Sequence, residues 1–434
     1  MRILRALGGT DFSAVVRLAR NRDFALYSGG KILANLGEWA QRVTIGWLTW
    51  QLTESAFWLG VIGFADLFPT VVIGAIAGTV VDRSDYMKLV KGVQVAAVLV
   101  SLALTLFTAF GALTIGILAV LTLLRGIAQA FYRPARMVLV YNLVDDRDLP
   151  SAIAISSIIF NAARFVGPAV GGALMLWGGP VLSFAVAAAT YVLFLVALQV
   201  MDVAPMTPAR AGRRGLLRET ADGVRHAFSA PGIALLLVVV IVIALAVRPF
   251  LELLPAFADE VFAGGIGSLT LLLTANGLGA TLAGLWLAGR PGGVSGLTRV
   301  VVANVLAIGL SVAAFALVPW LWLALPLLTV AGFCLVVQGV AVQTLVQASV
   351  APAMRGRVLG LYALLARGCP ALGALAIGGL AEWLGPQAPV AIGGALAVVL
   401  WLLLLGRREA VARAVERRPD EAPKPVSEHG DVAE

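Results

Sequence analysis

The chain is divided into apolar runs of about 20 residues, and this pattern constrains its fold more than any other feature. A helix of that length crosses the hydrocarbon core of a bilayer and satisfies its own backbone hydrogen bonds there. Hydrophobic residues make up 60% of the chain and charged residues only 13%, and the mean hydropathy is +0.94. We therefore predict an all-α membrane protein with twelve transmembrane helices. The predicted spans are 24–50, 58–81, 89–110, 113–130, 152–176, 180–201, 233–258, 268–288, 300–318, 321–345, 359–380 and 390–405.

Positive charge is distributed unevenly between the predicted loops. Of the 32 Lys and Arg residues, we place six deep inside spans, and the other 26 fall in the two tails and in alternate loops, with Lys91 at the cytoplasmic end of the span 89–110. The remaining loops contain neither Lys nor Arg. The positive-inside rule then places both termini in the cytoplasm. Because the net charge of +8 is explained by this placement, we expect no nucleic-acid partner.

Internal similarity predicts two bundles of six helices. Trp177-Gly178-Gly179-Pro180 recurs as Trp383-Leu384-Gly385-Pro386, and an arginine inside a span precedes each copy. A six-helix unit begins and ends on the same side of the membrane, so its duplication gives parallel repeats with a substrate path between them. The predicted segments are a cytoplasmic N-terminal segment (1–23), a first bundle (24–203), a cytoplasmic linker with an amphipathic helix at 216–228 (204–231), a second bundle (232–406) and a cytoplasmic disordered tail (407–434).

The first span carries polar residues that do not suit lipid. Lys31, Asn35, Glu38 and Arg42 fall within about 60° on one face of a helix. Ionised side chains at bilayer depth are costly unless they are paired or hydrated. We predict that this face lines a water-filled cavity. The alternative is an ion pair between Glu38 and Arg42 that only holds helices together.

Two stretches resemble motifs of the major facilitator superfamily. Gly78-Thr79-Val80-Val81-Asp82-Arg83 resembles the loop between its second and third spans. The resemblance implies that Asp82 and Arg83 belong to a latch on the cytoplasmic gate. Gly78 permits close contact with a neighbouring helix, and we place it with them among the gating residues. Gly167-Pro168-Ala169-Val170-Gly171-Gly172 resembles a fifth-span motif associated with export by antiport. The alternative for this second stretch is a bent, tightly packed helix without a role in direction.

Other residues resemble one branch of this superfamily. Arg125 is similar to a buried arginine proposed to handle protons. Three further stretches resemble the exporters of siderophores (enterobactin type) and macrolides, and they are Arg133-Pro134-Ala135-Arg136, Asp148-Leu149-Pro150-Ser151-Ala152 and Arg355-Gly356-Arg357-Val358-Leu359. The resemblance implies a proton-coupled antiporter that exports an amphipathic small molecule, a siderophore or a drug, by alternating access. The resemblance also implies a plasma membrane, the inner membrane of a bacterium. We expect the protein to act there as a monomer, with membrane lipid around it.

The charged residues inside the spans are the candidate site. Six cations against Glu38, Asp66 and Glu252 leave an excess of three positive charges, which favours an anionic substrate. Glu38 is the first candidate for proton coupling, followed by Asp66 and Glu252. The alternative for each carboxylate is a structural ion pair, and the alternative for Arg164 and Arg367 is a role in gating. The predicted cavity residues are Lys31, Asn35, Glu38, Arg42, Arg125, Arg164, Arg248, Glu252 and Arg367.

The sequence argues against an enzyme. It contains neither His-Glu-x2-His nor Gly-x-Ser-x-Gly, and both histidines, His226 and His429, fall outside the predicted spans. Its two cysteines lie in apolar runs without partner ligands, so we predict no metal and no cofactor. Two alternative hypotheses for the function are a lipid or lysophospholipid flippase on the same fold and a membrane receptor that binds its ligand without transporting it.

Overall fold

The computed structural model describes residues 12–74, 84–203, 229–290 and 293–416, together with Ala77, Val80, Val81, Arg225 and Ala227. The described residues form helices joined by turns, with no strand among them. The elements are α2 (Phe12–Arg20), α3 (Arg22–Thr53), α4 (Ala56–Val72), α6 (Tyr86–Ala109), α7 (Ile115–Leu143), α8 (Leu149–Val200), α10 (Pro231–Val242), η2 (Ile243–Val247), η3 (Arg248–Leu253), α11 (Leu254–Ala256), η4 (Phe257–Val261), α12 (Gly265–Ala288), α13 (Leu297–Leu317), α14 (Leu321–Ser349), α15 (Pro352–Leu384), α16 (Gln387–Leu405) and α17 (Arg408–Val415).

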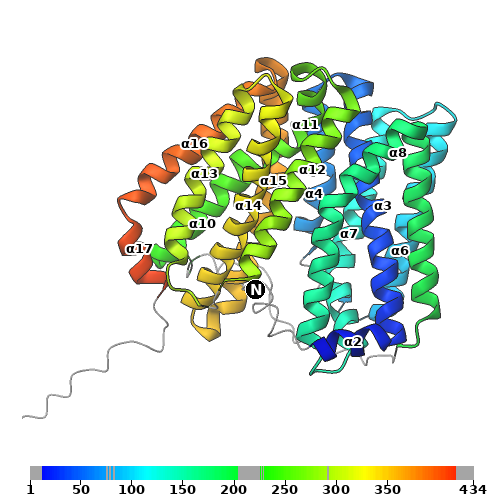
Figure 1. Cartoon of the computed structure of the whole chain (residues 1–434), viewed down its shortest axis with the longest axis horizontal. Coiled ribbons are helices and arrows are strands. Elements are labelled where there is room, and N and C mark those ends of the chain that lie inside the picture. Colours follow the sequence, from blue (N-terminus) through cyan, green and yellow to red (C-terminus); the bar gives the residue numbers. More distant parts are fainter. Residues whose placement is uncertain are drawn as a thin grey trace, which may run out of the picture.

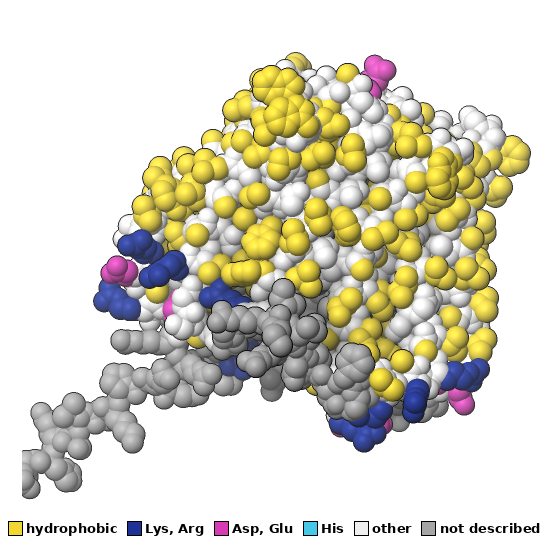
Figure 2. All heavy atoms as spheres, in the orientation of Figure 1, with side chains coloured by type: hydrophobic (Ala, Val, Ile, Leu, Met, Phe, Trp, Pro, Cys, Tyr) yellow, Lys and Arg dark blue, Asp and Glu magenta, His cyan; other side chains and the backbone are white. Residues whose placement is uncertain are grey.

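The long helices have the length and composition of membrane spans. Nine helical segments within the described residues are long and apolar enough to cross a bilayer, and α4 is a shorter apolar helix of 17 residues. Large apolar side chains such as Leu99, Leu285 and Leu403 are more than half exposed on outer faces, and Figure 2 shows apolar atoms over the sides of the molecule. Surfaces of this kind fit lipid rather than water. The prediction of an all-α membrane protein is therefore confirmed.

The α8 segment contains a sharp break near its middle. Its 52 residues include two with non-helical backbone, Gly178 (φ −143°) and Gly179 (φ +67°, ψ −167°). A positive φ with extended ψ is accessible mainly to glycine, so the sequence Gly178-Gly179-Pro180 reverses the chain here. The turn coincides with the loop predicted at 177–179.

The segment from Pro231 to Val261 departs from α-helical geometry. It passes from α10 through π-helix and 3-10 turns, with Pro249 and Pro255 inside the irregular part. Proline removes a backbone donor and displaces the preceding turn, and mid-helix irregularity of this kind often marks a functional position. The irregular turn η3 carries both Arg248 and Glu252.

Helix α7 extends well beyond the predicted fourth span. The span was predicted to end at residue 130, with Arg133 to Arg147 in a cytoplasmic loop, whereas α7 continues to Leu143 with Pro134 inside it. Buried Ala135 and Leu139 explain the continuation, because they pack into the same apolar cluster as Tyr132. Arg133 therefore belongs to a helix rather than to a loop.

Both ends of the described chain carry a short packed helix that the sequence did not predict. The sequence favoured a disordered tail from residue 407, yet α17 is helical because Val411 and Val415 are buried against neighbouring helices. The Glu416 carboxylate then accepts hydrogen bonds from the backbone N–H groups of Gly296 (2.9 Å) and Thr298 (2.8 Å). Helix α2 is held by an ion pair of 2.6 Å between Arg17 and Asp148.

The predicted linker helix at 216–228 lies almost entirely outside the described residues, as does the tail beyond residue 416.

The helices lie on two sides of a central surface, which we call the seam. Figure 1 shows α3 and α6–α8 on one side and α10, α13, α14 and α16 on the other. Helix α4 packs against α15 across the seam, and α8 packs against α12. We call the end that holds α2 and α17 the tail end, and the opposite end, where α3 ends and α4 begins, the far end.

Candidate functional site

Hydrogen bonds and close backbone contacts join the two sides of the seam at the far end. The Trp50 indole N–H donates to Asp259 (2.9 Å). The Glu382 carboxylate accepts from the Ser55 hydroxyl (2.9 Å) and from the Phe57 backbone N–H (3.1 Å), so a residue of α15 caps the first turn of α4. Carboxylates at a helix N-terminus are favourable because orphan N–H groups and the helix dipole both attract them.

Glycines allow close helix crossings along the seam. A Cβ at Gly378 would lie 2.7 Å from the Ala56 carbonyl oxygen and 2.9 Å from the Gly60 Cα. A Cβ at Gly277 of α12 would meet the Arg164 carbonyl oxygen of α8 at 2.5 Å. Helix backbones therefore touch across the seam at Gly378 of α15 and at Gly277 of α12.

The predicted gating residues of the fifth span lie at close helix contacts, two with α3 on the same side of the seam and one across it. Gly167 faces the Trp39 side chain, Gly171 faces the Ala40 backbone, and Gly172 faces Thr270 of α12 across the seam. Pro168 is buried within α8. These positions have the close packing expected of the motif, and their role in gating stays a prediction. The other predicted gating residues, Gly78, Asp82 and Arg83, lie outside the described residues.

A cavity of about 250 Å³ lies at the seam, and we call it the arginine cavity. Residues of α3, α4, α7 and α8 line it from one side, and residues of η3, α12 and α15 line it from the other. Its apolar wall includes Trp39, Phe160 and Leu251. Its charged lining consists of Arg42, Arg133, Arg164, Arg248, Arg367 and Glu252.

One ion pair crosses the arginine cavity. The Arg42 guanidinium donates to the Glu252 carboxylate at 2.8 Å, and both side chains are partly exposed to the cavity. The ion pair between Glu38 and Arg42, which was the alternative to a cavity, is not formed, because Arg42 reaches across the seam instead. Five arginines against one carboxylate give the cavity an excess of four positive charges when all are ionised.

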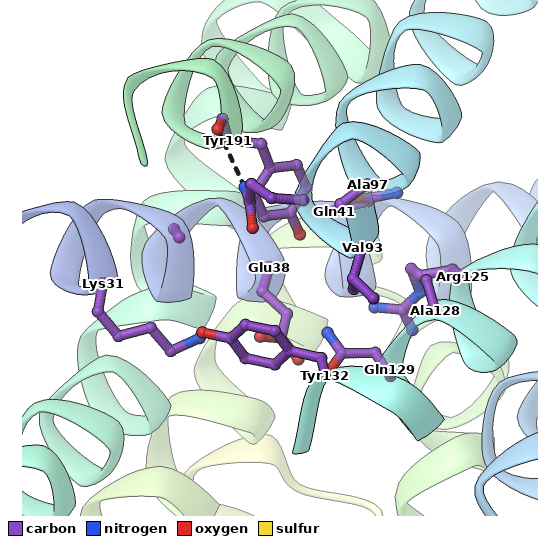
Figure 3. Close-up of a pocket in the computed structure, with 12 residues that line it drawn as sticks. Lys31, Glu38, Gln41, Val93, Ala97, Arg125, Ala128, Gln129, Tyr132 and Tyr191 are labelled. Carbon is purple, nitrogen blue, oxygen red and sulfur yellow. Dashed lines mark hydrogen bonds between the residues drawn. The ribbon is translucent and has the colours of Figure 1, made fainter. Parts of the chain in front are cut away.

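A second, smaller cavity lies among the N-terminal helices, and we call it the N-terminal pocket. It measures about 30 Å³, space for a few water-sized particles. Figure 3 shows Lys31 and Glu38 of α3 pointing toward Tyr132 and Gln129 of α7. The remaining polar lining comes from Gln41, Gln94, Arg125 and Tyr191.

Contacts around the N-terminal pocket are specific. Arg125 forms an ion pair of 2.6 Å with Asp66 of α4, and both side chains are largely buried. The Lys31 ammonium lies 4.7 Å from the centre of the Tyr132 ring, a cation–π contact. Within the described part of the chain, neither Lys31 nor Glu38 lies within ion-pairing distance of an opposite charge.

The predicted cavity residues therefore divide between two sites. Five of them line the arginine cavity and three line the N-terminal pocket. Asn35 lies in neither lining and is buried, with its side-chain amide unpartnered within the described residues. Sequence reasoning missed Arg133 because it ended the fourth span too early, although the apolar residues from Ala135 to Val140 indicated that the helix continues.

Characterised transporters are among the proteins that this chain resembles. The chain is 27% identical over 394 residues to the multidrug efflux pump Tap of Mycolicibacterium fortuitum. The aligned region covers 86% of this chain and 92% of Tap. It is 30% identical over 273 residues to the enterobactin exporter EntS of Escherichia coli and 24% identical over 263 residues to the staphyloferrin A transporter of Staphylococcus aureus. Those matches cover 61% and 60% of this chain, and they span 62% and 66% of the two relatives, slightly less than two thirds of each.

Solved structures share the fold. The nucleoside transporter NupG superposes with a TM-score of 0.70 at 16% identity, covering 88% of this chain and 98% of NupG. A bacterial homologue of the human lysosomal transporter Spinster superposes with a TM-score of 0.67 at 15% identity. The superposition covers 91% of this chain and 98% of the homologue.

The family model described as transmembrane secretion effector matches residues 18–428, nearly the whole chain. Together with the helical membrane fold and its relatives, this match confirms the resemblance stated from the motifs. The chain belongs to the transmembrane secretion effector family of the major facilitator superfamily, and it is an integral membrane transporter rather than an enzyme.

Proposed function

We propose that this protein is a proton-coupled exporter of an amphipathic, anionic small molecule, such as a siderophore or a drug, and that it works by alternating access. The observation that carries the proposal is the arginine cavity, which lies at the seam and is lined by charges from both sides. A site shared by two halves can be exposed to either side of a membrane when the halves rock against each other.

The helix count supports a twelve-span transporter with two bundles. Nine segments satisfy the length and composition of a span within the described residues. Helices α3 and α4 add two, and the reversal at Gly179 divides α8 into two spans, which gives twelve. We assign residues 24–203 to one bundle and 232–406 to the other.

The distribution of charge and the packing of the far end support an orientation of the protein in the membrane and a conformational state. Figure 2 shows Lys and Arg side chains gathered at the tail end, which the positive-inside rule places in the cytoplasm. The far end, closed by Trp50–Asp259 and by the cap from Glu382, then faces outward. In this arrangement the structure represents a state that is closed to the outside.

The lining of the arginine cavity and the names of the relatives support an anionic, amphipathic substrate. Four excess positive charges in a region of reduced dielectric attract an anion strongly, and the apolar wall suits a hydrophobic portion. Staphyloferrin A and enterobactin are the molecules named for two relatives, and Tap is named as a multidrug pump. An anionic siderophore or an acidic drug satisfies both the charge and the apolar wall.

Glu38 is the carboxylate that we assign to proton coupling. It has no ion-pair partner within the described residues, whereas Asp66 and Glu252 are each paired with an arginine. Because an arginine already compensates each of those two carboxylates, Glu38 is the carboxylate left for the proton. It lies one helical turn from Arg42, which lines the arginine cavity.

The first experiment measures transport of anions in proteoliposomes with an imposed proton gradient. A panel of anionic, cationic and zwitterionic amphiphiles, including siderophores and macrolides, identifies a substrate. Arg248→Gln and Arg367→Gln should then weaken its binding about tenfold or more, because each loses a charge-assisted hydrogen bond. Arg290→Gln, which changes an arginine outside the cavity lining, is the matched control. Equal affinity in all three variants would remove the arginine cavity as the substrate site.

The second experiment tests coupling separately from binding. Glu38→Gln should abolish transport driven by a proton gradient while substrate counterflow without a gradient continues. Unchanged gradient-driven transport in this variant would exclude Glu38 as the coupling residue.

A further inference from the structure

We propose that the N-terminal pocket binds one small monatomic anion of the chloride class, and that it binds this anion most tightly when Glu38 is protonated. The proposed function gives this pocket no ligand other than a proton. The link to protonation rests on the proposed role of Glu38, whereas the anion site itself stands on the geometry of the pocket.

Three buried side chains offer hydrogen-bond donors without partners. Gln41 is 1% exposed and Arg125 and Tyr132 are each 7% exposed. The Gln41 Nε2, the Arg125 Nε and the Tyr132 hydroxyl have no hydrogen-bond partner within the described residues, and all three side chains line the pocket. Unpartnered buried donors are costly, so a ligand that accepts hydrogen bonds is favoured there.

Contacts outside the pocket hold these donors in place. The Ser101 hydroxyl donates to the Gln41 Oε1 at 3.0 Å, which fixes the amide and leaves its N–H groups for another acceptor. Arg125 is held at its other end by Asp66. The donors are therefore presented by rigid elements before any ligand arrives.

The volume of the pocket limits the size of the ligand. About 30 Å³ accommodates only a few water-sized particles, far less than the 250 Å³ of the arginine cavity. A monatomic anion fits it and can accept hydrogen bonds from several directions.

Charge distinguishes an anion from a water molecule as the preferred ligand. Arg125 is compensated by Asp66, but Lys31, only 7% exposed, has no carboxylate within ion-pairing distance in the described structure. An ionised Glu38 balances the charge of Lys31, whereas a protonated Glu38 leaves one positive charge uncompensated in the pocket. Proton binding and anion binding then favour each other by the same factor.

The charged and titratable groups around Glu38 come from four helices. They are Lys31 and Arg42 on α3, Asp66 on α4, Arg125 and Tyr132 on α7 and Tyr191 on α8, and α6 contributes the amide of Gln94.

The test is calorimetric titration of sodium chloride into the purified full chain in detergent, with sodium gluconate as the background salt. Chloride should bind at least about tenfold more tightly at about pH 5 than at about pH 8. Lys31→Met and Gln41→Leu should each weaken binding about tenfold or more at the lower pH. Lys88→Met, which removes an exposed lysine outside the pocket, should leave it unchanged.

Other variants separate this site from the arginine cavity and from the transport mechanism. Chloride binding that survives in Lys31→Met and disappears in Arg367→Gln would place the anion in the arginine cavity and overturn the proposal. Absence of chloride binding at both pH values would mean that the pocket holds water only, which also overturns it. Glu38→Gln should bind chloride equally at both pH values, and an unchanged pH dependence would refute the linkage. Chloride binding of the expected kind in a protein without proton-driven transport would refute the proposed function alone.

Discussion

Closure of the far end can be tested with a single methyl group at Gly378. Its Cβ would lie 2.7 Å from the Ala56 carbonyl oxygen and 2.9 Å from the Gly60 Cα, and both atoms belong to backbone that cannot rotate away. Helices α4 and α15 must separate by several tenths of an ångström to accept Gly378→Ala. Overpacking of this kind costs about 1–3 kcal/mol. The neighbouring substitution Gly379→Ala is a close control, because a Cβ there has nothing within 4 Å.

If α4 and α15 separate at the far end during transport, the overpacking in Gly378→Ala destabilises only the state in which this end is closed. A destabilisation of 1–3 kcal/mol then shifts the population of the outward-open state about 5- to 150-fold. The gain in helix propensity from Gly to Ala is about 1 kcal/mol in both variants, so it cancels in the comparison. We therefore expect Gly378→Ala, and not Gly379→Ala, to open the far end.

Spin-label distance measurements report this opening directly. Trp177→Cys and Trp383→Cys place labels on exposed positions of the two bundles at the far end, where the side chains are 82% and 89% exposed. Cys334 and Cys369 are first replaced by alanine to remove the native thiols. Gly378→Ala should add a population at longer distance. Identical distance distributions in the Gly378 and Gly379 variants would refute the reasoning that the α4–α15 contact closes this end.

Four further substitutions test other parts of the structure. Arg133→Gln should weaken anion binding about tenfold in equilibrium binding assays, since this arginine lines the arginine cavity. Glu252→Gln should strengthen anion binding and slow turnover in transport assays, because the anion no longer competes with the Glu252 carboxylate for Arg42. Weaker anion binding in this variant would contradict the expected competition. Glu382→Ala should raise outside accessibility of cavity cysteines to an impermeant maleimide, since it removes two hydrogen bonds across the seam. Val415→Ala should destabilise the docking of α17 by about 2 kcal/mol and lower the unfolding midpoint in detergent, since this side chain is 1% exposed.

Hydrophobic periodicity predicted the helical membrane fold because each span must be apolar over its own length, which is a local property of the sequence. It also predicted that Lys31 and Arg42 share a helix face. It did not predict that they line different cavities, although helix geometry explains the result. Eleven residues at 1.5 Å each separate the two side chains by about 16 Å along α3, which is too far for one small cavity.

The partners of each charge depended on contacts between helices that are distant in sequence. Arg42 is 210 residues from Glu252, and a pairing with nearby Glu38 was the simplest local expectation. The local expectation failed because α3 lies at the seam, where a residue of the second bundle comes closer. The packed tail helix α17 was missed for a similar reason. Its sequence is charged, and the two valines that hold it are buried only when the other helices supply a surface.

Helix α3 connects every element of the proposed mechanism. Glu38 faces the N-terminal pocket, Arg42 pairs with Glu252 in the arginine cavity one turn later, and Trp50 bonds to Asp259 at the far end. The last two contacts cross the seam, so both must break when the far end opens. The contacts of Glu38 lie within its own bundle and move with α3. A change of charge at Glu38 can therefore act on the seam only through α3, either by shifting its position or by changing the field at Arg42. Proton and substrate would then be coupled along one helix rather than at one shared site.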